Sequence, residues 1–306
     1  MSKKILFMGT PDYATTIFKE LINSKYEIVG LFTQPDKPVG RKQILTVPHI
    51  KQYCIDANIN IPVFQPLKLR NNEELIKQIE DLKPDFIIVA AYGQILPKEI
   101  LDIAPCINLH ASLLPKYRGA SPIQESLLND DIYTGVTSML MEEGLDSGDI
   151  LGLQYLRITS TMEVSEAFEK LSLIAAKLTI TTLDNFENIK PIKQNESQVS
   201  FCKKIKKEDG LVDFIDAKKL YLKYKAYSYW PGIFLESELK LKDIELNDEK
   251  SINNQGQILE IEDDFIIVGC EKGSLKIRTL QAPSKKAMNT IDYIRGQRLE
   301  INSILI

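Results

Sequence analysis

The chain has few of the residues on which metal, disulfide and redox chemistry depend. Its four cysteines are widely spaced along 306 residues, and none belongs to a Cys-x-x-Cys pair. This spacing argues against a zinc site and a disulfide scaffold, and it is typical of a protein kept in a reducing cytoplasm. We therefore expect a cytoplasmic protein without a metal.

Long apolar runs and a strong charge of one sign are also missing. No window approaches the roughly 18 consecutive apolar residues of a membrane span, and the apolar run near the N-terminus is too short for a signal peptide. The formal net charge is −4, which does not indicate a nucleic-acid partner. We expect no membrane association, and any contact with nucleic acid must depend on local clusters of cations.

The dinucleotide-binding pattern Gly-x-Gly-x-x-Gly is absent from the first turn, which disfavours an NAD enzyme. Residues 4–8 nevertheless form a continuous apolar run, as expected of a buried parallel strand, and a turn and a helical pattern follow. Further strands are predicted at 27–33, 61–65 and 84–91, with helical patterns between them. This alternation predicts an α/β fold with a Rossmann-like, doubly wound and mostly parallel sheet.

The length predicts two domains. A first domain is expected at residues 1–189, and the polar, proline-containing stretch that follows is expected to form a linker at 190–206. Short strands separated by turn signals predict a small β-barrel at 207–306. The single tryptophan, Trp230, is expected to anchor the core of that domain at a turn.

The most informative segment spans residues 108–122, Asn-Leu-His-Ala-Ser-Leu-Leu-Pro-Lys-Tyr-Arg-Gly-Ala-Ser-Pro, after an apolar run that predicts a buried strand. Asn108 and His110 lie at the end of this strand, and their spacing of two places both side chains on one face. Open α/β sheets bind ligands at this edge. A histidine can carry a proton near neutral pH, and an asparagine can donate to a developing oxyanion. Asp146 follows in a glycine-flanked turn between two predicted strands.

Each of these residues has an ordinary structural explanation when taken alone. A single histidine is more often a packed or surface group than a catalyst, an asparagine at a strand end is usually a cap, and Asp146 is typical of an Asx turn. Histidine is scarce, however: of His49 and His110, only His110 lies at a strand end with an amide two residues before it. The combination therefore favours a functional site.

Residues 108–122, together with Leu-Asp-Ser-Gly-Asp-Ile at 145–150, resemble the folate-dependent formyltransferases, and the resemblance extends over essentially the whole chain. Within this family the chain is similar to the members that act on methionyl-tRNA. The resemblance implies transfer of a formyl group from 10-formyltetrahydrofolate to the α-amine of methionine on initiator tRNA, without a metal. It also implies that residues 1–189 are catalytic and that residues 207–306 form an OB-like, tRNA-binding barrel. We expect a monomer.

The implied reaction assigns a role to each candidate. His110 would take the proton of the attacking amine and return one to the leaving folate nitrogen. Asn108 would donate to the formyl oxygen, and Asp146 would orient the imidazole and favour its cationic form. The folate is expected to contact four residues of the following turn: Ser112, Leu113, Leu114 and Pro115.

Two cationic segments are expected to contact tRNA. By composition alone the loop at 34–42 would be a solvated connection, but its Pro-Asp-Lys-Pro-x-Gly-Arg pattern is similar to the loop that the tRNA-acting members place against the acceptor end. A lysine run at 203–207 could neutralise several phosphates. The candidates on these two segments are Arg41, Lys42, Lys203, Lys204, Lys206 and Lys207.

Two other functions stay open at this point. A formyltransferase acting on a small amine, of a nucleotide or an amino sugar, would use the same three residues but would need neither the Arg41 loop nor a C-terminal barrel. A non-catalytic folate-binding or RNA-binding module would need no acid–base pair. The presence of Asn108, His110 and Asp146 argues against this last possibility.

Overall fold

The computed structural model of the chain describes residues 2–40 and 42–305, so the predicted tRNA contact Arg41 lies outside the described residues. The chain forms two compact units, each made of segments that are not contiguous in sequence. The first unit comprises Met1–Pro122, Tyr133–Arg157 and Phe168–Cys202. The second comprises Ile123–Ile132, Ile158–Ala167 and Lys203–Ile306.

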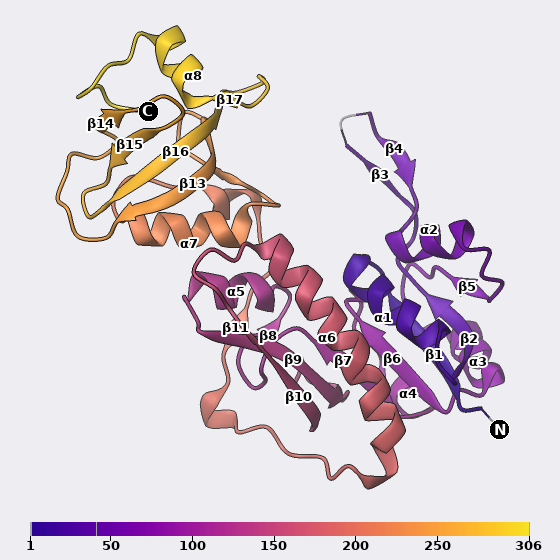
Figure 1. The fold of residues 1–306 in the computed structure, drawn as a ribbon. Helices are drawn as coiled ribbons and strands as arrows, with labels where there is room; N and C mark the ends of the chain where they lie inside the picture. The colour runs from indigo at the N-terminus through magenta and orange to yellow at the C-terminus, as the bar shows by residue number, and fades with distance from the viewer. Residues whose placement is uncertain (1, 41, 306) are drawn as a thin grey trace. The chain divides into compact units, whose positions relative to one another are not determined.

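A seven-stranded sheet forms the centre of the first unit (Figure 1). Its strands are β1 (Lys4–Gly9), β2 (Glu27–Phe32), β5 (Val63–Phe64), β6 (Phe86–Ala90), β7 (Cys106–His110), β9 (Tyr133–Leu140) and β10 (Ile150–Arg157). Their order is β10-β9-β7-β6-β1-β2-β5. The five strands from β7 to β5 are parallel, and β9 and β10 form an antiparallel hairpin beside them. The predicted α/β fold with a mostly parallel sheet is therefore confirmed.

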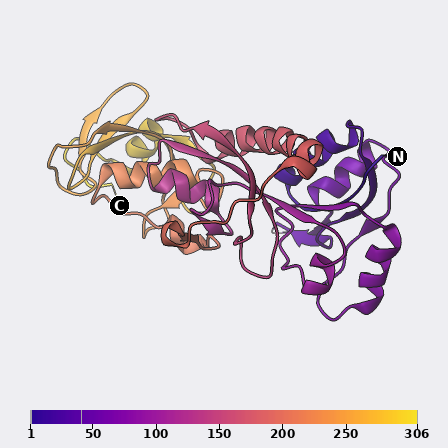
Figure 2. The ribbon, with the colours of Figure 1, turned by 90° about the horizontal axis from the view of Figure 1, so that it is seen from below.

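Helices cover both faces of this sheet (Figures 1 and 2). The helices of the first unit are α1 (Asp12–Ile22), α2 (His49–Asp56), α3 (Glu73–Leu82), α4 (Lys98–Leu101) and, from Phe168 onward, α6 (Val164–Asn185). On one face Phe7 of β1 packs against Phe18 of α1, with ring centroids 5.2 Å apart. On the other face Leu6 and Met8 share an apolar cluster with Ile79 of α3. Alternate residues of β1 thus face opposite helical layers, which explains the continuous apolar run in the sequence.

The stretch predicted as a linker is partly paired with the first unit. Ile192 forms a β-bridge with Ile150, and β11 (Phe201–Cys202) pairs in parallel with β8 (Arg118–Gly119). Two 3₁₀ turns lie in this region: η1 (Phe186–Asn188) and η2 (Glu196–Gln198). The first pairing places Ile192 beside the start of β10, and the second places residues 201–202 beside the loop that follows β7.

The second unit is built on a smaller antiparallel sheet with the order β12-β13-β16-β15-β14, and β17 pairs with β16. Its strands are β12 (Ile233–Phe234), β13 (Lys240–Asp248), β14 (Ile258–Ile261), β15 (Ile266–Gly269), β16 (Ser274–Gln281) and β17 (Met288–Asn289). Its helical segments are most of α5 (Pro122–Leu128), η3 (Lys207–Gly210), α7 (Ala217–Tyr227) and α8 (Thr290–Gln297). The predicted small β domain after the α/β domain is confirmed.

Trp230 does not anchor the core of this unit. Its surface is 50% exposed, whereas Tyr227 nearby is 6% exposed and belongs to the core. The expectation of a buried tryptophan was therefore wrong. The strand β13 was not predicted because charged residues separate its apolar positions, although Leu241 and Ile244 are buried.

The core of the first unit offers a matched test of burial. Leu21 of α1 is fully buried and Leu67 is 85% exposed. We predict that Leu21→Ala lowers the free energy of unfolding by about 2–5 kcal/mol, because it removes packed methyl groups and leaves a cavity. The same change at Leu67 should alter it by less than about 0.5 kcal/mol. Urea denaturation of both variants measures the difference, and equal losses would contradict the assigned core.

Candidate active site

The strand β7 places Asn108 and His110 near its carboxyl end, between β6 and β9. His110 is only 6% exposed. The Tyr13 hydroxyl of α1 donates to the Leu109 carbonyl at 3.2 Å and so attaches the helix to this strand. Burial raises the pKa of the Tyr13 hydroxyl, and it raises the pKa of the Cys106 thiol to about 12. Both groups therefore stay neutral near physiological pH.

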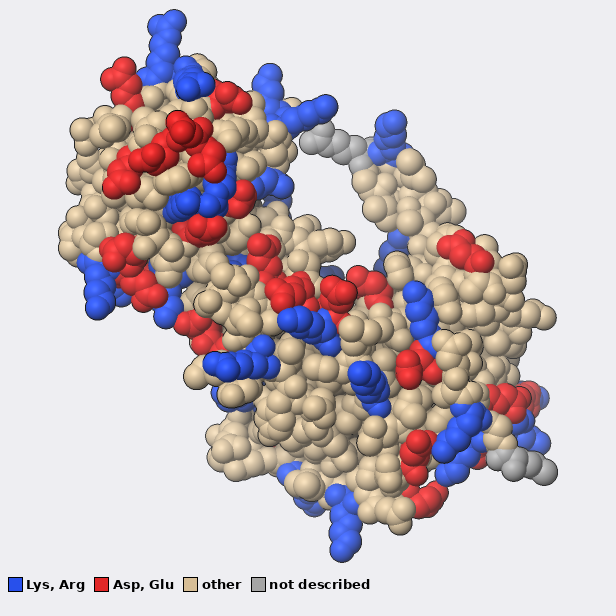
Figure 3. Space-filling view, viewed as in Figure 1, with Lys and Arg blue, Asp and Glu red and all other residues tan. Residues whose placement is uncertain are grey.

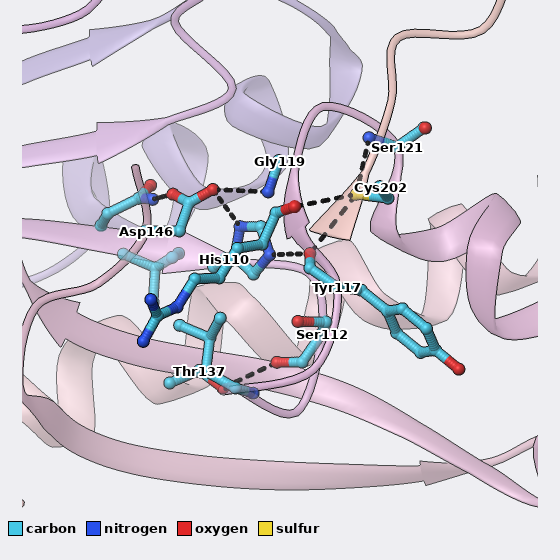
Figure 4. Close-up of polar contacts among 12 residues, drawn as sticks. His110, Ser112, Tyr117, Gly119, Ser121, Thr137, Asp146 and Cys202 are labelled. Carbon is cyan, nitrogen blue, oxygen red and sulfur yellow. Dashed lines mark hydrogen bonds and ion pairs between the residues drawn. The ribbon is translucent and has the colours of Figure 1, made fainter. Parts of the chain in front are cut away.

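Asp146 lies in the turn between β9 and β10 and brings the three predicted residues together (Figure 4). Its Oδ1 accepts a hydrogen bond from Asn108 Nδ2 at 3.3 Å. Its Oδ2 accepts one from the Gly119 backbone N–H at 2.8 Å and lies 3.7 Å from His110 Nδ1. The carboxylate side chain is 14% exposed. An amide, an imidazole and a carboxylate thus converge in a largely buried position.

The ring of His110 is held from the side opposite Asp146. Its Nε2 lies 2.9 Å from the Tyr117 carbonyl oxygen, and a carbonyl can only accept, so Nε2 must carry a hydrogen. The other ring nitrogen, Nδ1, faces Asp146. The 3.7 Å between Nδ1 and Asp146 Oδ2 is longer than a hydrogen bond, so Nδ1 is oriented by the carboxylate without being bonded to it. Figure 4 shows the ring between Asp146 and Tyr117.

The segment predicted to bind folate begins the loop after β7: Ser112, Leu113, Leu114 and Pro115. The Ser112 side chain is fully buried, and its hydroxyl donates to the Lys116 carbonyl at 2.6 Å. The Thr137 hydroxyl donates to the Ser112 carbonyl at 2.7 Å and accepts from the Leu114 N–H at 3.0 Å. The Ser112 side chain therefore shapes the loop, while the half-buried Leu113 and Pro115 keep surface that a ligand can contact.

The loops after β1, β2 and β6 meet at the carboxyl edge of the sheet. The Tyr92 carbonyl accepts hydrogen bonds from Thr10 Oγ1 at 3.2 Å and from Gln34 Nε2 at 3.1 Å. The chain passes from β1 to β2 and β5 on one side and then returns from β5 to β6 on the other side of β1, so the sheet has its topological switch point between β1 and β6. This edge, next to β7, is where the fold is suited to hold a small ligand.

Two backbone contributors to the site were missed by the sequence analysis: the Tyr117 carbonyl and the Gly119 N–H. Every residue type has these groups, so side-chain patterns do not reveal them. The glycine at position 119 was itself a hint in the sequence that the backbone is closely packed there. Its φ of +124° favours glycine, and an added Cβ would lie 2.2 Å from the Cys202 carbonyl oxygen.

The predicted tRNA-contacting lysines lie on two separate segments. Lys42 is exposed between β3 (Lys37–Val39) and β4 (Ile44–Thr46), which form an antiparallel hairpin in the stretch whose composition favoured a solvated connection. The lysines of the other segment are all exposed: Lys203, Lys204, Lys206 and Lys207. On the face seen in Figure 3, Lys and Arg side chains are interspersed with Asp and Glu.

The β3–β4 hairpin carries more exposed apolar surface than a solvated connection needs. Val39, Ile44 and Leu45 are 56%, 62% and 67% exposed. At its base the Asp36 carboxylate accepts hydrogen bonds from Gln65 at 2.7 Å and from Lys51 at 2.9 Å. These two partners lower the pKa of Asp36 below its usual range, so its carboxylate stays ionised and connects the base of the hairpin to Lys51 and Gln65.

Among the described residues, no cluster of three or more His, Cys, Asp or Glu side chains is arranged to hold a metal ion. None of the described helices combines the length and apolar character that crossing a membrane requires.

A buried amide–imidazole–carboxylate group beside the ligand edge of an α/β sheet is suited to acyl transfer, and the comparisons identify the family. Residues 3–183 match the formyl transferase family, and residues 204–298 match the formyl transferase C-terminal domain. The chain therefore belongs to the formyl transferase family.

Its curated relatives are similar over their full length. The chain is 57% identical to the methionyl-tRNA formyltransferase of a Nitratiruptor species, covering 97% of this chain and 98% of the relative. It is 55% identical to the methionyl-tRNA formyltransferase of Campylobacter lari, covering 99% of both. Among solved structures, an N-formyltransferase from Helicobacter canadensis in complex with folinic acid and dTDP-3-aminofucose shares the fold. Its TM-score is 0.68 at 16% identity, covering 91% of this chain and 99% of that one.

The geometry around Asp146 predicts the effect of replacing it by asparagine. The carboxylate presents two acceptors to two N–H donors, whereas an amide, whichever way it is turned, places its own N–H₂ toward Asn108 or Gly119. We predict that Asp146→Asn lowers kcat for formyl transfer by about 10²–10³-fold, because the Asn108 side chain and the Gly119 loop, which meet at this carboxylate, would shift. Steady-state kinetics measures this. The control is Glu143→Gln, an exposed carboxyl of the same turn, which should stay within about twofold. Near-normal kcat for Asp146→Asn would contradict the assignment.

Proposed function

We propose that the chain transfers the formyl group of 10-formyltetrahydrofolate to the α-amine of methionine esterified to initiator tRNA. The observation that carries this proposal is the convergence of Asn108, His110 and Asp146 at the ligand edge of the sheet. It occurs in a chain more than half identical, over its whole length, to proteins named methionyl-tRNA formyltransferase.

The contacts in the site support separate roles for His110 and Asp146 in this reaction. The attacking amine must be neutral, and an α-amine with a pKa near ~8 is partly neutral already at physiological pH. His110 Nδ1 is the nitrogen available to take the proton that the amine loses on attack, since Nε2 is committed to the Tyr117 carbonyl. The same nitrogen returns a proton to the folate nitrogen that leaves. Asp146 keeps the ring in place during both transfers.

Asn108 is proposed to stabilise the oxyanion. The formyl oxygen gains negative charge when the amine attacks, and a preorganised donor at that point lowers the barrier. One N–H of the Asn108 amide is directed at Asp146 Oδ1. This contact fixes the plane of the amide, so its second N–H is already oriented before the substrate arrives.

The loop at 112–115 and the switch point are proposed to hold the folate, whose formyl group then lies beside His110. The internal hydrogen bonds of Ser112 and Leu114 support this, because they rigidify the loop in advance of binding. Residues 1–189 are proposed as the catalytic domain, 190–206 as the connection and 207–306 as a tRNA-binding domain. A cytoplasmic, monomeric enzyme is in keeping with a substrate used in translation.

The tRNA is proposed to contact the β3–β4 hairpin and the lysines at 203–207. Exposed cations neutralise phosphates, and the exposed apolar side chains of the hairpin supply surface that a large partner can cover. A small amine substrate would not need the hairpin or the lysines at 203–207 for binding.

A formyl-transfer assay with three acceptors tests the function. We predict transfer to charged initiator tRNA in preference to charged elongator methionine tRNA and to a nucleotide-linked amino sugar. His110→Ala should lower the rate by about 10²–10⁴-fold, the usual contribution of general acid–base catalysis. Circular dichroism of this variant confirms that it folds. Transfer to the amino sugar alone would overturn the assigned substrate, and near-normal turnover by folded His110→Ala would overturn the role of the histidine.

The hairpin loop gives a separate prediction about tRNA. We predict that Arg41→Ala lowers kcat/KM for charged tRNA by roughly one to two decades, as expected for a lost charged contact worth about 1.5–3 kcal/mol. Folate binding, followed by fluorescence titration, should stay near normal. Arg70→Ala, which removes an exposed arginine elsewhere in the first unit, is the matched control and should change kcat/KM little. Equal loss of folate affinity in Arg41→Ala would mean that the loop shapes the folate site instead.

A further inference from the structure

The side-chain amide of Gln194 fills all four of its hydrogen-bonding positions. It lies in the segment that follows η1 and is only 9% exposed. Its Nε2 donates to the carbonyl oxygens of Asp146 and Gly148, each at 2.8 Å. Its Oε1 accepts from Arg118 Nε at 3.0 Å and from Arg118 Nη2 at 2.9 Å. An amide has two donors and two acceptor lone pairs, so none is left for another partner.

These partners also determine which way the amide points. A guanidinium can only donate and a carbonyl can only accept, so a turned amide would set donor against donor and acceptor against acceptor. Gln194 therefore has one orientation, in which its Nε2 donates to the backbone of the turn that contains Asp146. Such a buried and fully satisfied polar contact is rigid and costly to break.

The turn that contains Asp146 needs hydrogen bonds from outside itself to hold its backbone. Asp146 has a φ of +49°, a left-handed conformation that costs a non-glycine residue free energy. Gly148 packs so closely on the end of β9 that an added Cβ would lie 1.7 Å from the Leu140 carbonyl oxygen. Gln194 bonds to the backbone at both residues, and so it holds the part of the turn from which the catalytic carboxylate extends.

Gln194 also connects this turn to the loop that contacts the same carboxylate. Arg118, 4% exposed, precedes Gly119, whose N–H donates to Asp146 Oδ2. The Arg118 N–H donates to the Ser200 carbonyl at 2.9 Å, next to the pairing of β8 with β11. One amide thus ties together the two backbone segments that fix the carboxylate.

We propose that Gln194 is a positioning residue for formyl transfer, which holds Asp146 in the place where its carboxylate orients His110. This inference rests on the proposed function for its activity readouts, but its structural part concerns the folded protein alone. The residue contacts no reacting atom; it acts through the Asp146 turn.

Two substitutions at Gln194 separate the contribution of its donor side from that of its acceptor side. Gln194→Leu removes all four hydrogen bonds at similar volume, and Gln194→Glu keeps the acceptors for Arg118 but has no donors for the Asp146 and Gly148 carbonyls. We expect both variants to lower kcat by about 10–100-fold, the scale of a small misplacement of catalytic groups, with KM for folate and tRNA changed less than about threefold. Gln198→Leu, an exposed glutamine of the same segment, is the matched control and should stay within about twofold. Wild-type kcat for Gln194→Glu would overturn the proposal, because only the bond to Arg118 would then matter.

A double-mutant cycle with Asp146→Ala distinguishes positioning from general stability. If Gln194 acts through Asp146, Gln194→Glu should cost less than about twofold in the Asp146→Ala background. Losses that multiply in the double variant would overturn the proposal.

An NMR measurement gives a readout without turnover. The chain has two histidines, and His49, whose Nδ1 lies 2.8 Å from Thr15 Oγ1, serves as an internal reference. In Gln194→Glu the ¹⁵N signals of the His110 ring should move while those of His49 stay. Unmoved His110 signals would count against the proposal even in an inactive protein. Absence of transfer by the wild-type chain would instead count against the proposed function.

Discussion

The arrangement of the site depends on one carboxylate that accepts hydrogen bonds from two segments and faces a third group. Asp146 receives the amide of Asn108 from β7 and the backbone N–H of Gly119 from the loop after it, and it lies beside His110. A carboxylate suits this place because it presents acceptors only. An uncharged replacement of the same shape cannot accept from both donors. The strand, the loop and the turn would then no longer be joined by this side chain.

The sheet explains how this carboxylate reaches the strand. The register places Leu140 at the end of β9 opposite Ile107, and the Met141 N–H donates to the Cys106 carbonyl at 2.8 Å. The turn therefore begins beside the first residues of β7 and folds back to reach Asn108 and His110. A turn that doubles back in this way needs bonds from outside itself, and the segment around Gln194 provides them.

Several features follow from tertiary contacts that no local pattern encodes. The stretch after residue 189 looked like a linker because it is polar and contains proline, yet Ile192 and β11 pair with the first unit. The loop at 34–42 looked like a solvated connection, yet it contributes to a hairpin whose apolar side chains face solvent. Trp230 looked like a core residue by type, yet half of its surface is exposed. In each case residue type and composition were not enough, because contacts with distant segments decided the structure.

The sequence by itself determined the strand and helix alternation, the order of the two domains and the shared face of Asn108 and His110. These follow from hydrophobic periodicity and from the alternation of side chains along a strand, which are local properties. The family resemblance implied the role of Asp146 beside His110. Only the tertiary structure decided that the Tyr117 carbonyl holds Nε2, that the Gly119 N–H meets the carboxylate and that Gln194 supports its turn. The physical reason is that backbone groups are the same in every residue, so their role is set by which distant segments pack together and not by the side chains that the sequence displays.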